Sequence, residues 1–351
     1  MLTTPLADRV TACITLLAAS TIAIWAQTAQ PSDVIVVQGA GSTFAAPLYK
    51  KWIDEFDVLH RNGRISYDAV GSGEGVKRFL AGTTDFAGSD ELLSDGETAK
   101  VPGAIVLPVT AGMIALAYNI PGVNTEIKLP RDVCVDIFTR KIRKWDDPRI
   151  VAANPGIAFP HRDIALVVRQ DSSGTTAAFI SHLVAISPAW QAAGMGVGKL
   201  IEWPAGILPA SGNEGVAARI RLSEGSIGYV EYWFAQRLGL KMAAVQNKAG
   251  AYITPTERSG ELALSSRVAQ VGELAASVAD PSGAGAYPIT TYSWMFLYGR
   301  YADPAKGAMV RDFARWGLSQ AGQNYGAQLG YLPLSDDVTE LGNQALHGLT
   351  E

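Results

Sequence analysis

The stretch VIVVQGAGSTFAAPLYKKW, residues 34–52, begins as a run of apolar β-branched residues and then turns through glycine and serine. Apolar residues follow at every fourth position, at Leu48, Trp52 and Phe56, with charged residues between them. This order predicts a strand, a glycine turn and a helix. A helix that starts on such a turn can offer its free N–H groups to an anion. The turn therefore suits a dinucleotide, a smaller anion, or no ligand at all.

The spacing within the turn argues against a dinucleotide. GAGSTF (39–44) begins with the G-x-G of the dinucleotide fingerprint, but Phe44 stands where a third small residue belongs. The acidic residue after the next predicted strand, Asp68, comes several residues later than the fingerprint requires. A P-loop is not supported either, because GMGVGKL has the wrong spacing and no hydroxyl follows Lys199.

The composition is that of a soluble protein with a large core. Of 351 residues, 48% are hydrophobic and 18% are charged, which is typical of a globular chain, and the length favours two lobes. The net charge of −4 argues against nucleic acid as a partner, which would need a basic face. It does not exclude a small anion, because a buried site responds to its own dipoles.

Residues 1–29 differ in composition from the rest. One arginine precedes the mostly apolar run VTACITLLAASTIAIWA, and alanines at 26 and 29 could end a cleaved segment. The pattern predicts a cleaved signal peptide and an exported, free mature protein; the alternative is an uncleaved anchor, for which the run is short and interrupted. Cleavage would remove Cys13 and leave Cys134 alone, which excludes an intrachain disulfide and a cysteine metal site.

From Val34 onward, short apolar strands alternate with amphipathic helical stretches. This alternation predicts an α/β fold with largely parallel sheets. Near the end, AMVRDFARWGLSQAGQNYGAQLG predicts a pair of helices. Two apolar segments stand out: 104–120, which we expect to form two strands separated at Pro108, and 287–299.

Those two segments suggest how the chain divides. If each crosses between lobes, the first lobe comprises 34–109 plus 290–351, and the second comprises 110–289. Two crossings form a hinge, and a hinge between α/β lobes places a cleft at the ends of their strands.

Three turns share one design, because each places small or hydroxyl residues where a helix begins. They are GAGSTF (39–44), GSGEG (71–75) and DSSGTT (171–176). Any one of them can be a simple helix cap. Three in one chain, one of them closely preceded by Arg169, favour a shared anion site.

Seven motifs in this order resemble the substrate-binding proteins of high-affinity phosphate ABC transporters: GAGSTFAAPLYKKW, GSGEGVKRFLAGTTDFAGSD, IFTRKIRKWDDPRI, VVRQDSSGTT, WPAGILPASGNEGVA, EGSIGYVEYWFA and LGYLPL. The resemblance spans about residues 36 to 340. It implies a two-lobed "Venus flytrap" with two crossover strands and a cleft between the lobes. It also implies a monomeric, non-catalytic, periplasmic receptor without cofactor or metal, which binds inorganic phosphate and delivers it to the permease subunits of an ABC transporter.

The resemblance also implies the ligand residues. The expected phosphate-binding set is Thr43, Phe44 (through its N–H), Ser72, Asp90, Arg169, Ser173, Gly174 and Thr175, with Asp171 supporting Arg169. Each has a structural alternative. The hydroxyl residues can be plain caps, Arg169 with Asp171 can be a structural ion pair, and Asp90 can simply begin a turn.

Asp90 is the unexpected member of an anion site. An ionised carboxylate accepts hydrogen bonds and cannot donate them, so it repels an oxyanion that carries no proton. It can accept the hydroxyl of HPO4²⁻ or H2PO4⁻. One acceptor among many donors would therefore admit phosphate and reject sulfate.

Two acidic residues depart from the family pattern and leave the choice of ligand open. Glu74 and Glu91 stand where small residues are usual, and both would add negative charge if they faced the cleft. One alternative is a receptor for another tetrahedral oxyanion or a sensor of phosphate status. A phosphatase is less supported, because the four scattered histidines (60, 161, 182 and 347) suggest neither a metal cluster nor a nucleophile–base pair.

Overall fold

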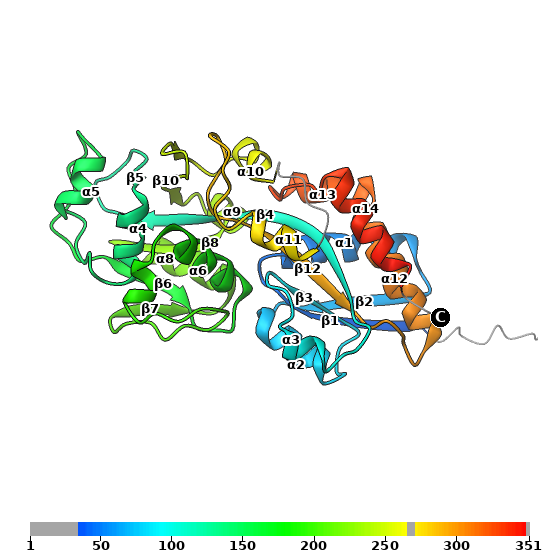
Figure 1. Ribbon diagram of the computed structural model, residues 1–351. Helices are drawn as coiled ribbons and strands as arrows, with labels where there is room; N and C mark the ends of the chain where they lie inside the picture. Colours follow the sequence, from blue (N-terminus) through cyan, green and yellow to red (C-terminus); the bar gives the residue numbers. More distant parts are fainter. Residues whose placement is uncertain (1–33, 265–270, 349–351) are drawn as a thin grey trace, which may run out of the picture. The chain divides into compact units, whose positions relative to one another are not determined.

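One long strand, β4 (Ile105–Asn119), is shared by two groups of strands (Figure 1). Neighbouring strands follow the order β2-β1-β3-β12-β4-β8-β6-β7, and β9 also pairs with β4. The other strands of this sheet are β1 (Ile35–Gly41), β2 (Gly63–Asp68), β3 (Phe86–Ser89), β6 (Ala165–Arg169), β7 (Ile207–Ala210), β8 (Ser226–Glu231), β9 (Lys241–Met242) and β12 (Thr290–Leu297). A separate sheet has the order β11-β10-β5, from β5 (Lys128–Leu129), β10 (Ala244–Gln246) and β11 (Tyr252–Ile253).

This computed structural model describes residues 34–264 and 271–348. The predicted signal peptide, 1–29, lies outside these ranges and so does Cys13. Within them, none of the helices combines the length and apolar character that crossing a membrane requires.

The long strand changes partner along its length. Residues 105–113 of β4 pair with β12, and residues 114–119 pair with β8. We call β1, β2, β3, β12 and the first part of β4 the first sheet, and the rest of the path the second sheet. The lobe boundary expected at 109/110 stays a prediction.

The sheets are mixed, so the expectation of largely parallel sheets is wrong. Strand pairs β1–β2, β1–β3, β6–β7 and β6–β8 are parallel, whereas β12 and β4 run antiparallel to all their neighbours. A parallel pair needs a crossover connection, and helices lie between the strands of the parallel pairs. The two apolar segments form β4 and β12, which are far apart in the sequence. They pair antiparallel and therefore need no crossover connection.

Pro108 does not break β4 into two strands, as we expected from the sequence. Ser293 lies opposite Thr110 and Trp294 lies opposite Pro108, so the register shifts and Val109 has no opposite residue on β12. Proline lacks an N–H and is tolerated in a strand at such a bulge. The strand therefore continues through the proline.

The helices cover the sheets and agree largely with the sequence pattern. Leu48, Trp52 and Phe56 are buried on one face of α1, and the predicted terminal pair is formed by α12 and α13. A further terminal helix, α14, was not predicted. The helices are α1 (Ala46–Leu59), α2 (Ser72–Leu80), α3 (Asp95–Thr98), α4 (Arg131–Phe138), α5 (Pro148–Ala153), α6 (Gly174–Ile186), α7 (Ala189–Ala192), α8 (Gly212–Leu222), α9 (Tyr232–Arg237), α10 (Glu257–Ala263), α11 (Val271–Ser277), α12 (Pro304–Leu318), α13 (Gln320–Gln328) and α14 (Asp336–Leu346).

Four of these helices begin just after parallel strands: α1 after β1, α2 after β2, α6 after β6 and α8 after β7. Ligands of open α/β sheets bind outside the carboxyl ends of such strands. The polar turns singled out in the sequence therefore lie where a ligand would be expected.

Candidate functional site

Asp90 follows the end of β3 and is held by hydroxyl groups. Its side chain is buried, and Oδ1 accepts hydrogen bonds from Ser42 Oγ at 2.6 Å and Ser293 Oγ at 2.9 Å. Its N–H donates to Ser72 Oγ at 3.3 Å. None of the described residues gives Oδ2 a hydrogen bond of ordinary length, although the Thr175 hydroxyl is near enough to favour the ionised form. One carboxylate oxygen is thus fixed and the other is left to accept.

The surroundings of Asp90 make its proton affinity unusual. Burial raises the pKa of this carboxyl to about 6, against the lowering effect of the Ser42 and Ser293 hydroxyls and of the Arg169 charge. The group therefore titrates close to neutral pH. A carboxyl with that pKa is suited to sharing a proton with an oxyanion.

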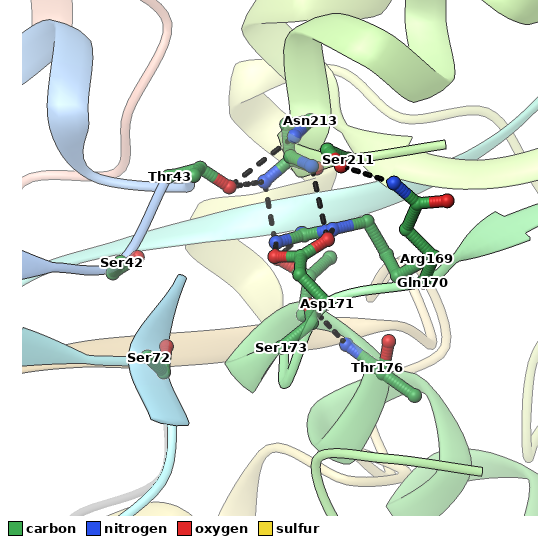
Figure 2. A network of polar contacts seen from close by, with 12 residues as sticks. Ser42, Thr43, Ser72, Arg169, Gln170, Asp171, Ser173, Thr176, Ser211 and Asn213 are labelled. Carbon is green, nitrogen blue, oxygen red and sulfur yellow. Dashed lines mark hydrogen bonds and ion pairs between the residues drawn. The ribbon is translucent and has the colours of Figure 1, made fainter. Parts of the chain in front are cut away.

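Arg169 ends β6 and carries a buried positive charge. Its Nε donates to Asp171 Oδ1 at 2.8 Å and its Nη2 donates to Asp171 Oδ2, as Figure 2 shows. Its Nη1 points to Thr175 Oγ1 at 3.4 Å. Asp171 also accepts the Gly212 N–H at 3.0 Å. One edge of the guanidinium is therefore held by a carboxylate, while Nη1 faces the start of α6.

The pKa of Asp171 moves in the opposite direction from that of Asp90. Burial by itself would raise it, but the hydrogen bonds and charge of Arg169 outweigh burial and hold the pKa below its usual range. Asp171 thus remains ionised and keeps the guanidinium fork in place.

The start of α6 touches the start of α2 and Asp90. Ser173 caps α6 by accepting the Thr176 N–H at 3.1 Å. A Cβ placed on Gly174 would lie 2.5 Å from Ser72 Oγ and 2.8 Å from Asp90 Cβ, so only glycine fits this close approach. The N–H groups of Gly174 and Thr175 occupy the first two helical positions, where a helix supplies no acceptor of its own. These N–H groups are available to donate hydrogen bonds to an anion.

The GSGEG and DSSGTT turns pack directly on one another. The Gly73 N–H donates to the Ser172 carbonyl at 3.0 Å. Gly71 has φ +91, and a Cβ there would lie 2.6 Å from Asp171 Oδ2. Two of the three turns predicted to share a site are therefore in contact.

The third turn, GAGSTF, is built differently from our expectation. Ala45 occupies the cap position of α1 and offers no side-chain cap. Ser42 Oγ instead accepts the N–H groups of Phe44 and Ala45, at 3.0 Å and 3.2 Å, while it donates to Asp90. The Phe44 N–H expected to bind the ligand is thus engaged inside the turn. The Thr43 hydroxyl lies at the site, 3.2 Å from the N–H and from Nδ2 of Asn213 (Figure 2).

Three polar residues of the site were missed in the sequence: Ser42, Asn213 and Ser293. Each carried a weak signal. Ser42 and Asn213 lie within the family motifs, and Ser293 is a small polar residue near the middle of a strand, TTYSWMFL, whose residues are all buried.

The two acidic residues that depart from the family pattern are compensated by cations. Glu74 lies on α2, half-exposed, and pairs with Arg78 at 3.0 Å. Glu91 pairs with Lys199 Nζ at 3.1 Å. Both negative charges are thus partly neutralised outside the group around Asp90.

The described residues give little support for metal binding or for chemistry at a cysteine or histidine. No group of three or more His, Cys, Asp and Glu side chains is placed there to hold a metal ion. Burial raises the pKa of the Cys134 thiol to about 12, which makes it unreactive. His182 is buried, and its Nδ1 contacts the Ala279 carbonyl.

A cavity of about 800 Å³ opens beside the site. Thr43, Asp171 and Asn213 form part of its lining, together with Trp233 and Lys50. The hollow therefore borders the side of the site formed by Thr43, Asp171 and Asn213, whereas Asp90 and Arg169 do not line it.

A family model described as the PBP superfamily domain matches residues 26–321. The phosphate-binding protein PstS of Methanocaldococcus jannaschii is 32% identical over 349 residues, which cover 92% of this chain and 90% of the relative. Those of Haemophilus influenzae and Pasteurella multocida are 33% and 34% identical, covering 86% and 87% of this chain and 90% and 88% of the relatives.

Two solved structures share the fold. The high-affinity periplasmic phosphate-binding protein PfluDING, bound with phosphate, superposes with a TM-score of 0.71 at 20% identity, covering 90% of this chain and 99% of the other. A phosphate-binding protein from Stenotrophomonas maltophilia gives 0.68 at 21% identity, covering 88% and 93%. These similarities confirm the predicted two-lobed α/β binding-protein fold. This chain belongs to the PBP superfamily and, within it, to the family of PstS phosphate-binding proteins.

Proposed function

We propose that this chain binds inorganic phosphate at the site around Asp90 and Arg169. The observation that carries the proposal is the single acceptor among donors: Asp90 Oδ2 is left to accept, while Oδ1 is held by Ser42 and Ser293. A ligand that offers its own hydroxyl satisfies this oxygen, whereas sulfate offers none at neutral pH. A buried acceptor left unpaired costs about 1–3 kcal/mol or more, which is enough to reject sulfate.

The donors that would surround the phosphate come from both sheets. Thr43 and Ser72 follow strands of the first sheet, and Ser173, Gly174 and Thr175 follow β6 of the second. Arg169 supplies the positive charge, and Asp171 holds the guanidinium in a fixed plane. Two helix starts add partial positive charge. Phe44 would join this set only if its N–H left Ser42.

We further propose that the bound phosphate is delivered to the permease subunits of an ABC transporter. The relatives in Haemophilus influenzae and Pasteurella multocida are named as binding proteins, which supports a receptor without catalytic activity. Residues 1–29 would direct the chain to the periplasm, where it would act as a free monomer. A ligand that stabilises the closed form would let a permease distinguish loaded from empty receptor.

Calorimetric titration of the purified protein with phosphate and with sulfate tests the proposal. We expect 1:1 binding of phosphate in the micromolar range or tighter, and binding of sulfate that is at least a hundredfold weaker. Equal affinities, or no phosphate binding, would overturn it. Turnover of p-nitrophenyl phosphate would indicate a phosphatase instead.

A further inference from the structure

The buried residue Asn213 contacts the candidate site without belonging to the expected ligand set. It is the second residue of α8, and its side chain is completely buried. Its Nδ2 donates to Thr43 Oγ1 at 3.2 Å and to Thr175 Oγ1 at 3.1 Å, and its backbone N–H also donates to Thr43 Oγ1 at 3.2 Å. Its Oδ1 accepts the Glu231 N–H at 2.9 Å. Both protons of the amide nitrogen and one lone pair of the amide oxygen are therefore in use.

These contacts fix which end of the amide faces the site. The Glu231 N–H is a donor and requires an acceptor, so the oxygen of Asn213 must point toward it. The NH2 group must then point toward Thr43 and Thr175 (Figure 2 shows the Thr43 contact). The orientation follows from the hydrogen-bond network alone.

The same contacts fix the direction of two hydroxyl protons. A threonine hydroxyl has one proton and two lone pairs. Thr43 Oγ1 receives two donors from Asn213, and Thr175 Oγ1 receives Asn213 Nδ2 and Arg169 Nη1. With both lone pairs occupied, each hydroxyl can only donate its proton to a third group. For Thr175 that group is the Asp90 carboxylate while the site is empty, and a bound oxyanion would take its place.

We propose that Asn213 is a positioning residue that turns Thr43 and Thr175 into obligate donors toward a bound oxyanion. The inference rests on the proposed function. Thr43 follows β1 of the first sheet, whereas Thr175 and Asn213 follow β6 and β7 of the second. The Asn213 side chain therefore joins the two sheets at the site and orients a donor from each.

Asn213→Asp keeps the shape of the side chain and replaces the NH2 group by an acceptor. Thr43 and Thr175 would then donate to the new carboxylate and withdraw their protons from the ligand. We expect phosphate affinity to fall at least a hundredfold for Asn213→Asp and roughly tenfold to a hundredfold for Asn213→Ala. Asn154→Ala is the matched control, because Asn154 is also buried and bonded to Lys128 and Ile150 away from the site. It should lower stability and leave phosphate affinity within about twofold.

A double-mutant cycle separates positioning from a general structural role. Asn213→Ala and Thr175→Val are made singly and together, and each variant is titrated with inorganic phosphate. If Asn213 acts through the hydroxyl, its effect shrinks severalfold once the hydroxyl is gone. Fully additive losses in cycles with both Thr175→Val and Thr43→Val would overturn the inference, as would unchanged affinity in Asn213→Ala. Failure of the unmodified protein to bind phosphate would instead refute the proposed function, and the inference with it.

Discussion

Two carboxylates of the site, Asp90 and Asp171, have opposite electrostatic surroundings. Asp171 receives the guanidinium of Arg169 and the Gly212 N–H, and its pKa is held below the usual range although burial opposes this. Asp90 receives hydroxyl groups, and burial raises its pKa to about 6. The cation is thus committed to one acid, while the other remains free to accept a proton-bearing ligand. The two aspartates thus differ in role because different groups surround them, although the residue type is the same.

Removing the cation should have the largest effect. Arg169→Met would leave Asp171 half-buried without its partner and would remove the only guanidinium that we assign to the ligand. We expect phosphate affinity to fall by about 3 kcal/mol or more, over a hundredfold, as measured by calorimetry.

Arg131 provides a matched control for that variant. It forms a two-pronged pair with Asp280, with both N–O distances 2.8 Å, and neither residue belongs to the site. Arg131→Met should lower the melting temperature and leave the dissociation constant nearly unchanged. An unaltered dissociation constant in Arg169→Met would place the ligand elsewhere.

Replacing the Asp90 carboxylate by an amide should affect selectivity more than affinity. Asp90→Asn introduces an NH2 donor where the ligand-free site has an acceptor. We expect the preference for phosphate over sulfate to fall at least tenfold, or about 1.4 kcal/mol, in competition calorimetry. In Asp171→Asn, by contrast, both anions should bind more weakly with a similar ratio. A mutant that rejects sulfate as well as the parent would remove Asp90 from this role.

Lowering the pH should weaken the preference for phosphate over sulfate without any mutation, because it changes the protonation of Asp90 and not that of Asp171. Near its pKa of about 6, Asp90 takes up a proton and becomes able to donate, whereas Asp171 stays ionised. Between about pH 7.5 and about pH 5, we therefore expect the phosphate-to-sulfate preference to drop severalfold. The same change should be small in Asp90→Asn. An unchanged preference across this range in the parent protein would contradict the assignment.

The stability of the ligand-free protein should depend on pH through the titration of Asp90. Because the folded-state pKa of Asp90 is raised, its favourable contribution is complete below the unfolded-state pKa and is lost as the pH rises through about 6. This part of the pH dependence of the melting temperature should disappear in Asp90→Asn. A retained dependence would assign it to other groups.

Neutralising Glu91, the acidic residue next to Asp90, should have the smallest effect on phosphate affinity. Glu91 is paired with Lys199, and its side chain is 40% exposed; an ion pair open to solvent on one side contributes about 0–1 kcal/mol. Glu91→Gln should therefore change phosphate affinity by less than about threefold, and the difference should shrink further in high salt. Glu74→Gln is its counterpart on α2. A large gain in affinity in Glu91→Gln would show that this carboxylate faces the ligand.

The sequence predicted the strand, turn and helix units well, because each depends on local periodicity and glycine placement. The family motifs led to Asp90, Arg169 and Asp171, and the structure brings these residues together. The terminal helix α14 was missed because we took the apolar pattern to end with the preceding helix pair.

Contacts between distant segments could not be read in this way. Ser42 and Ser293 meet at Asp90 only because strands β1, β3 and β12 lie side by side in one register, which periodicity does not set. Asn213 at a helix start resembles an ordinary cap until its partners are known. Pro108 suggested a break in the strand because proline cannot donate a ladder hydrogen bond. The bulge that accommodates it forms against β12, a strand far away in the sequence, and could not be predicted from the residues around Pro108.

The position of β12 also has a consequence for folding. This strand, Thr290–Leu297, lies between β3 and β4, which are distant from it in the sequence. Until β12 pairs with them, β3 and β4 each present an unpaired edge. Pairings between such distant segments form slowly, so we expect completion of the first sheet to limit the folding rate.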